Sequence, residues 1–215
     1  MMGDDARRDR LQRRLELAAT VLLAMAAVAT AWAAYQSARW HGKQAQSQSA
    51  SIAARVESTR TANVANRQAQ IDVALFTQWV DAYARDENEL AAFYRKRFRT
   101  EFRPAFEAWV TTRPRTNPGA PLSPFAMPQY KLAATAQADR LEAQAAAASQ
   151  DVGRFIQRAD NYSLTVVLFA ASLFFAGIST RLHSPTTRMI VLGLGYALFL
   201  GSLIWIATLP VSLSV

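Results

Sequence analysis

The residues best suited to chemistry are a group of carboxylates near the middle of the chain: Asp81, Asp86, Glu87 and Glu89. Calcium takes oxygen ligands of this kind. The group has no glycine and no EF-hand spacing, and basic residues follow it at Arg95, Lys96, Arg97 and Arg99. We therefore expect these carboxylates to pair with the arginines across a turn rather than to hold a metal ion.

The sequence contains no other motif that is typical of a catalytic or metal-binding site. The chain contains no cysteine, which excludes disulfides, thiolate catalysis and Cys-based metal sites. The two histidines, His41 and His183, lie beside different apolar segments, and no Gly-x-Ser-x-Gly, phosphate-loop or dinucleotide motif occurs. Glu101 and Glu107 stand in a basic, aromatic segment, so we expect them to form surface ion pairs. The sequence predicts no enzymatic activity, no cofactor and no metal.

The net charge of +8 is spread along the chain without a dense basic stripe, so nucleic-acid binding is not predicted. Arginine and alanine are abundant whereas lysine is rare. This bias is typical of a GC-rich bacterial genome.

Three uncharged apolar runs determine the predicted architecture: Leu17–Tyr35, Ser163–Thr180 and Met189–Leu209. Each is close to the roughly 20 residues that cross a bilayer as a helix. The first run could instead belong to a cleaved signal peptide, but it is longer than the usual apolar core of about 7–15 residues. We prefer an uncleaved anchor, which makes the chain a three-span membrane protein with one large polar insert.

Orientation follows from the basic residues beside these runs. Arginines precede the first run from Arg7 to Arg14, and Arg181 and Arg188 flank the short link between the second and third. Short loops rich in arginine stay in the cytoplasm. We therefore expect a bacterial cytoplasmic membrane protein with its N-terminus inside and residues 36–162 outside. Aromatic residues near the predicted boundaries are candidate interfacial anchors: Trp32, Tyr35, Trp40 and Tyr162.

The third apolar run carries small residues at four-residue spacing, at Gly193, Ala197 and Gly201. This spacing favours close helix packing in membranes. We expect this face to pack against the other spans of the same chain, with packing between copies as the alternative. Either arrangement would leave membrane lipid around the remaining surface.

The polar insert begins and ends with segments of similar length. No glycine or proline interrupts residues 43–103, which predicts long helices. The outgoing segment 36–70 and the alanine-rich returning segment 131–162 are expected to form an antiparallel stalk. Ile52 and Val56, with a few alanines, are the only candidates for its seam. Because so thin a seam buries little apolar surface, we expect stalks from several copies to associate.

Between the stalk segments, residues 71–130 form a predicted aromatic-cored helical cap. Its candidate core residues are Phe76, Trp79, Tyr83, Tyr94, Phe98 and Phe102. Four-residue spacing from Tyr94 to Phe106 predicts one face of a helix. We expect a helical hairpin that turns between Tyr83 and Asn88, the alternative being one helix that continues to Phe102. Pro104 is expected to bend or restart the second arm.

A proline-rich segment from Pro114 to Pro128 follows the aromatic helices and is predicted to be non-helical. We expect it to wrap the cap through Leu122, Phe125 and Met127. A partner-docking segment is the alternative.

The predicted fold class is an all-α membrane protein with three transmembrane helices, a long helical stalk and a small aromatic-cored cap outside the membrane. Its predicted segments are a basic cytoplasmic N-terminus (1–16), transmembrane helix (17–35), ascending stalk (36–70), cap (71–130), descending stalk (131–162), transmembrane helix (163–180), cytoplasmic loop (181–188), transmembrane helix (189–209) and extracytosolic tail (210–215).

Several stretches resemble a family of uncharacterised bacterial membrane proteins of unknown function. They are AWAAYQSARWHGKQA, WVDAYARDENELAAFYRKRFRTEFRPAFEAWVTTRP, SPFAMPQYKLAA and VVLFAASLFFAGISTRL. The resemblance implies the same arrangement of one N-terminal and two C-terminal spans, and it supplies no functional residues.

The sequence as a whole favours a non-enzymatic scaffold or interaction protein that forms homo-oligomers. The alternatives are a ligand-sensing or accessory subunit with a membrane-protein partner, or a homo-oligomeric channel.

Overall fold

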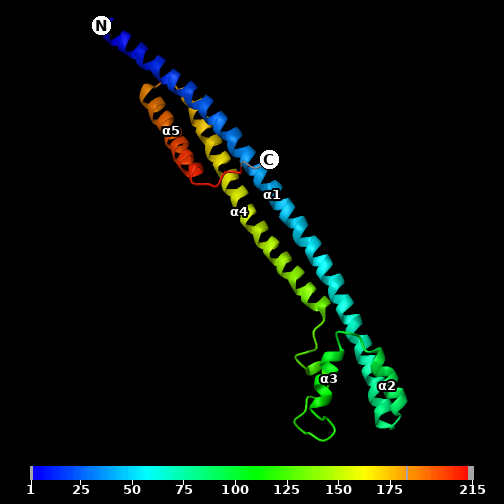
Figure 1. Cartoon of the computed structure of the whole chain (residues 1–215). Coiled ribbons are helices and arrows are strands. Elements are labelled where there is room, and N and C mark those ends of the chain that lie inside the picture. Colours follow the sequence, from blue (N-terminus) through cyan, green and yellow to red (C-terminus); the bar gives the residue numbers. More distant parts are fainter. Residues whose placement is uncertain (1, 183, 213–215) are drawn as a thin grey trace. The chain divides into compact units, whose positions relative to one another are not determined.

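The computed structural model describes residues 2–182 and 184–212, and the side chains among these from residue 10 onward. Of the predicted N-terminal segment 1–16, only residues 10–16 have described side chains. The loop residue His183 and residues 213–215 of the predicted tail lie outside the described residues. The elements are α1 (Met2–Ala84), α2 (Asn88–Arg97), α3 (Arg103–Thr111), the short 3₁₀ helix η1 (Pro124–Ala126), α4 (Ala133–Ser179) and α5 (Pro185–Ala207) (Figure 1).

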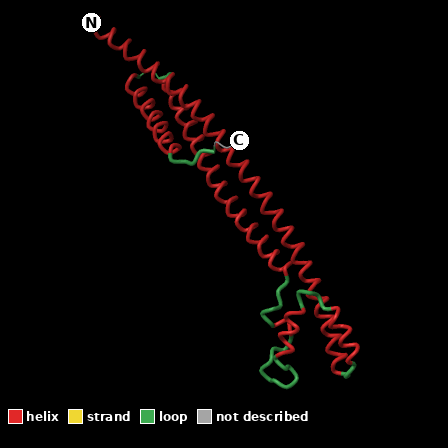
Figure 2. The backbone as a smooth tube through the Cα atoms, viewed as in Figure 1, coloured by secondary structure: helices red, strands yellow, loops and turns green. Residues whose placement is uncertain are grey.

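The described part of the chain contains helices and loops and no strand (Figure 2). The predicted all-helical fold is thus confirmed. Three of the helices, α1, α4 and α5, each contain a stretch that is long and apolar enough to cross a membrane. The chain divides into two compact units: Met1–Gln48 with Ser149–Val215, and Ser49–Ala148. Helices α1 and α4 contribute to both units.

In the first unit, α1, α4 and α5 lie side by side (Figure 1). Leu22, Phe169 and Phe199 are among its buried apolar side chains. Because Gly195 has no side chain, α5 can approach α1 and α4 closely at this position. A Cβ atom there would stand 3.2 Å from Cδ2 of Leu22 on α1 and 3.4 Å from the carbonyl oxygen of Ser172 on α4. The Ser172 hydroxyl donates to the Gly195 carbonyl oxygen at 2.9 Å, which joins α4 to α5.

The segment after α5 folds onto the same unit. The Ser212 backbone N–H donates to Oε1 of the buried Gln36 side chain at 3.0 Å, and the Tyr162 hydroxyl donates to the Pro210 carbonyl oxygen at 3.3 Å. The described residues of the predicted tail are therefore tied to α1 and α4, because polar groups in an apolar bundle need partners.

In the second unit, α1 and α4 pack antiparallel, as the sequence predicts, but through a different seam. The Ser51 and Ser58 hydroxyls donate to the carbonyl oxygens of Ala145 and Ala138, each at 3.0 Å. The predicted seam residues Ile52 and Val56 are instead 54% and 46% exposed. Serine and alanine take the inner positions because small side chains allow close backbone approach and each serine hydroxyl finds an acceptor across the seam.

The predicted hairpin turn is confirmed, and a helix continuing to Phe102 is excluded. Helix α1 ends at Ala84 and α2 begins at Asn88, with Asp86 at a left-handed φ of 60° between them. The prediction of one helical face from Tyr94 to Phe106 is wrong, since α2 ends at Arg97 and α3 begins at Arg103. Pro104 lies in the first turn of α3. It restarts the helix there, as predicted, because proline lacks the N–H that an uninterrupted helix would need.

Candidate functional site

The second unit has a core of aromatic side chains. Its buried members are Phe98, Phe102, Phe106 and Trp109. Packed against them are Leu75, Phe76, Trp79, Phe125, Met127 and Tyr130. Four of the six predicted core residues, Phe76, Trp79, Phe98 and Phe102, therefore belong to this cluster.

The other two predicted core residues lie at or beyond its edge. Tyr83 is 40% exposed and stacks on Trp79 with ring centroids 5.0 Å apart. Tyr94 packs edge-on against Phe93 instead, at 5.7 Å. Tyr94 is outside the cluster because the break after Arg97 separates its helix, α2, from the segment that carries Phe98 and Phe102.

The proline-rich segment packs on this core through some of its predicted side chains. Phe125 stacks on Phe102 at 5.1 Å, and Met127 also contacts the cluster. The indole N–H of Trp109 donates to the Pro121 carbonyl oxygen at 2.7 Å, which fixes the segment to α3. Leu122 is 99% exposed, so its predicted adhesive role is wrong.

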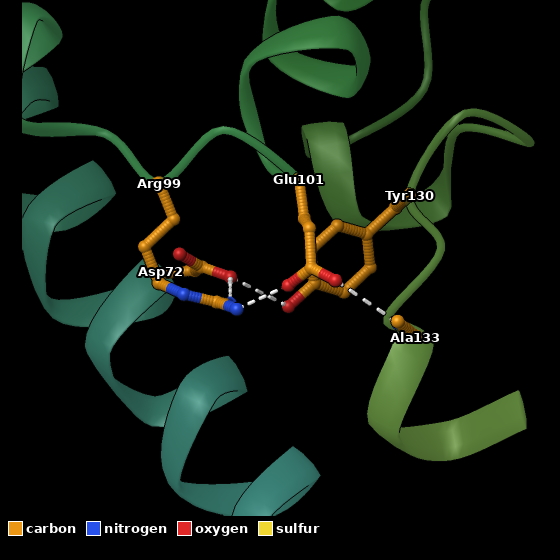
Figure 3. A network of polar contacts seen from close by, with 5 residues as sticks. All are labelled: Asp72, Arg99, Glu101, Tyr130 and Ala133. Atoms are coloured by element: carbon orange, nitrogen blue, oxygen red, sulfur yellow. Dashed lines mark hydrogen bonds and ion pairs between the residues drawn. The ribbon is translucent and has the colours of Figure 1, made fainter. Parts of the chain in front are cut away.

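A polar network joins four segments of the second unit (Figure 3). Oδ2 of Asp72, on α1, accepts hydrogen bonds from Nη1 of Arg99 at 2.9 Å and from the Tyr130 hydroxyl at 3.2 Å. Arg99 also forms an ion pair with Glu101. Oε1 of Glu101 accepts from the backbone N–H of Ala133, the first residue of α4, at 3.1 Å. Glu101 thereby satisfies one of the free N–H groups at that helix end.

Burial controls the electrostatics of this network. The Asp72 side chain is fully buried, and burial raises the pKa of Asp72 while the Arg99 guanidinium opposes the rise. Burial, together with the nearby Asp72 carboxylate, raises the pKa of Tyr130 to about 12. Tyr130 therefore remains a neutral hydrogen-bond donor at neutral pH. Oδ1 of Asp72 has no hydrogen-bond partner among the described residues.

The arrangement holds segments together rather than presenting a reactive group. A phenol with a pKa of about 12 releases its proton poorly near neutral pH, and Asp72 is enclosed. Sequence reasoning missed Asp72, although a signal was present. Asp72 precedes Leu75, Phe76 and Trp79 by three, four and seven residues, which places a lone carboxylate on the apolar face of its helix.

The carboxylates proposed to pair across the hairpin turn do not do so in the described structure. Asp81 pairs at 3.0 Å with Arg85, which directly follows the end of its own helix α1. Arg95 lies 3.8 Å from the exposed Glu107, and Arg99 bonds Asp72 and Glu101. The surface ion pair expected for Glu107 is confirmed, whereas Glu101 forms its ion pair within the partly buried network. No group of three candidate metal ligands occurs among the residues searched.

A groove of about 1030 Å³ lies beside the aromatic core within the second unit. Its aromatic walls come from Trp79, Tyr83, Phe106 and Trp109. Helix α2 contributes Ala91, Ala92 and Arg95, and the segment after α3 contributes residues from Arg113 to Leu122. This groove has the character of a binding site because it combines apolar walls with a few charged groups.

The predicted interfacial anchors fall into two groups. Trp32 and Tyr35 are 43% and 52% exposed on α1. Trp40 and Tyr162 are buried within the first unit, so for them the prediction of an outward-facing anchor is wrong. Trp40 packs on Phe155 at 5.6 Å, and an indole enclosed between helices cannot reach lipid head groups.

The small-residue face of α5 points away from its neighbours. Gly193, Ala197 and Gly201 are exposed, and a Cβ atom at either glycine would meet nothing within 4 Å. The preferred expectation, packing against spans of the same chain, is therefore wrong for this face. Gly195, on another face of α5, makes the close contact instead.

Comparisons of the chain with protein-family models, curated proteins and solved structures found no match. Function must therefore be inferred from the geometry of the molecule itself.

Proposed function

We propose that the chain is a multi-pass protein of a bacterial cytoplasmic membrane, with its N-terminus inside and residues 36–162 outside. The apolar stretches of α1, α4 and α5 support this placement, since each is long and apolar enough to span. The arginines before Leu17 and at Arg181 and Arg188 favour the cytoplasm for those segments.

The first unit also carries an apolar groove of about 490 Å³, lined in part by Met25, Val28, Trp32 and Leu203. A surface of this kind is unfavourable in water, and membrane lipid would cover it.

Within that membrane the protein acts as a non-enzymatic scaffold or interaction protein that presents its second unit, including an aromatic-cored cap, to the outside. The observation that carries this proposal is the pairing of an apolar three-helix unit with a polar unit whose aromatic core shapes an open groove. The residues that line the groove supply a binding surface, whereas Tyr130 and Asp72 form hydrogen bonds that hold segments of the second unit together.

Assembly into homo-oligomers is part of the proposal. Ile52 and Val56 are exposed on α1 in the second unit, and the Gly193–Gly201 face is exposed on α5 in the first. Both surfaces are free in the single chain, and small residues at four-residue spacing permit close helix contact between copies in a membrane.

Native mass spectrometry of the protein released from its own membrane tests the proposal, because it reports copy number and companions together. We expect a defined oligomer. The double variant G193I/G201I should lower the copy number, whereas G177I, on an open position of α4, should not. A stable monomer without companions would contradict the scaffold function.

The groove favours a second candidate, a ligand-sensing or accessory subunit of a transporter or signalling complex. Such a protein would pass a ligand-dependent change to a membrane-protein partner. Copurification of one transporter or kinase at fixed stoichiometry would support this function, and repeated isolation without a partner would count against it.

A homo-oligomeric channel is a weaker candidate because the hydroxyl groups of the apolar stretches already have acceptors. Thr165, Ser179 and Ser202 donate to carbonyl oxygens of their own helices, and Ser172 donates to Gly195. All four side chains are buried within one chain's bundle. They are therefore not available to line a pore between copies.

A further inference from the structure

We propose that the groove of the second unit binds an organic carboxylate with an aromatic or aliphatic body. The groove lies entirely within residues 49–148, so this inference does not depend on the membrane placement or on oligomer formation.

Charge selects an anion. The charged residues that line the groove are Arg95, Arg113 and Arg115, and no aspartate or glutamate lines it. Arg95 is partly offset by Glu107 at 3.8 Å. The side chains of Arg113 and Arg115 make no ion pair and no hydrogen bond within the described structure, so two guanidinium groups remain available. Guanidinium binds carboxylate strongly because it can donate two parallel hydrogen bonds.

The aromatic walls select an apolar body. Trp79 and Tyr83 stack with an interplanar angle of 11°, and Tyr83 is 40% exposed. The Arg115 guanidinium stands 5.4 Å from the centre of the Tyr83 ring. A ligand whose body packs against the exposed part of Tyr83 would therefore bring an attached carboxylate close to a cation.

The backbone holds one arginine at the rim in an unusual conformation. Arg113 follows α3 with φ of 57°, a left-handed conformation that glycine or asparagine usually occupies at a helix end. Asn117 stabilises the turn, since its N–H donates to the Arg113 carbonyl oxygen at 2.9 Å and its side-chain amide donates to Thr112 at 3.1 Å. The turn fixes Arg113 where the loop passes the groove.

The loop wall favours a small molecule over a peptide. Pro114, Pro118 and Pro121 all line the groove, and proline has no backbone N–H to pair with an added peptide strand. A volume of about 1030 Å³ stands at the upper end of the usual size of small-molecule sites.

Two probes of matched shape test the proposal: naphthalene-2-carboxylate, which is anionic, and naphthalene-2-carboxamide, which is neutral. Binding is measured by equilibrium dialysis of the full chain in lipid nanodiscs, with empty nanodiscs subtracted. We expect the carboxylate to bind about tenfold more tightly than the carboxamide, because each charge-assisted contact contributes more than a neutral one.

Variants identify the groove as the site. R113Q/R115Q should weaken carboxylate binding about tenfold. A matched control, R55Q/R67Q, removes the same charge from exposed positions of α1 in the same unit and should change it less than about twofold. A92W, which fills the groove from an exposed position, should block both probes.

Equal binding of the two probes, no binding above empty nanodiscs, or an equal loss in R55Q/R67Q would overturn the proposal. Binding of an acidic, aromatic peptide in place of the carboxylate would overturn it too, in favour of protein docking.

Discussion

At the scale of single residues, the second unit depends on a buried carboxylate. Asp72 is the one fully buried acidic side chain among the described residues, and it joins α1 to Arg99 and Tyr130. Such a pair contributes little net stability compared with apolar packing, but loss of one partner is costly because it leaves a buried charge uncompensated. The network therefore fixes the relative positions of its segments more than it adds stability.

Removal of Arg99 should strengthen the dependence of stability on pH. Burial already raises the folded-state pKa of Asp72, so its contribution to stability is greatest below the unfolded pKa and falls as pH rises through the folded pKa. R99Q removes the opposing cation and raises that pKa further. We expect R99Q to lose about 2 kcal/mol of unfolding free energy at pH 8, and less at pH 5, because a lower pH favours the protonated, uncharged form of Asp72.

Circular dichroism of the full chain during thermal unfolding in detergent measures this effect. In the D72N/E101Q background the further change R99Q should cost the same at both pH values, because neither carboxylate partner of Arg99 remains to titrate. A pH-independent loss in R99Q alone would show that Asp72 is not the group responsible.

At the scale of elements, the second unit packs α1 against α4 through small side chains. Ala145 is fully buried, and its carbonyl oxygen accepts the Ser51 hydroxyl bond. The helices approach closely because alanine and serine leave room for the facing backbone. Bulky Ile52 and Val56 point outward, which leaves apolar surface on the unit.

The substitution A145L should therefore be much more costly than A146L, one residue along the same helix. A larger side chain at the closed position forces the helices apart and costs about 2 kcal/mol. Ala146 is exposed, and the same change there should cost less than about 0.5 kcal/mol. Denaturant unfolding of both variants measures the difference, and equal costs would mean that the seam lies elsewhere.

Hydrophobic periodicity and turn residues predicted where the helices lie in the sequence. They did not predict which face of each helix packs against another helix. The turn between Ala84 and Asn88 and the restart at Pro104 follow from a polar stretch and a missing N–H, which are local properties. The seam could not be found from hydrophobicity, because the inner positions are serine and alanine rather than isoleucine and valine. Which residues take the inner positions depends on contacts with segments that are distant in the sequence.

The same limit applies to the candidate site. The aromatic residues from Phe76 to Trp109 indicated a core, but nothing local showed that Arg113 and Arg115 would line a groove beside it. Trp40 and Tyr162 stood at predicted boundaries, yet the fold buries them. Apolar side chains in the sequence indicate which residues can form a core. The shape of a cavity depends instead on where the loops beside that core lie in the fold.

At the scale of the whole molecule, the account depends on where a membrane lies. The apolar stretches of α1, α4 and α5 belong to the first unit, and the aromatic core and groove belong to the second. If the apolar stretches span the bilayer in the proposed orientation, the groove faces the extracytosolic space and can meet ligands or partners there. If they do not, the proposed function loses its basis.

Cysteine accessibility tests this claim most directly, because the natural chain contains no cysteine to interfere. Two variants each carry one cysteine at an exposed position: L122C in the proline-rich segment, and S184C in the loop between α4 and α5. In bacterial cells with an intact cytoplasmic membrane, a membrane-impermeant maleimide should label L122C at once and should label S184C only after permeabilisation. Labelling of S184C in intact cells together with protection of L122C would contradict the proposed orientation and function.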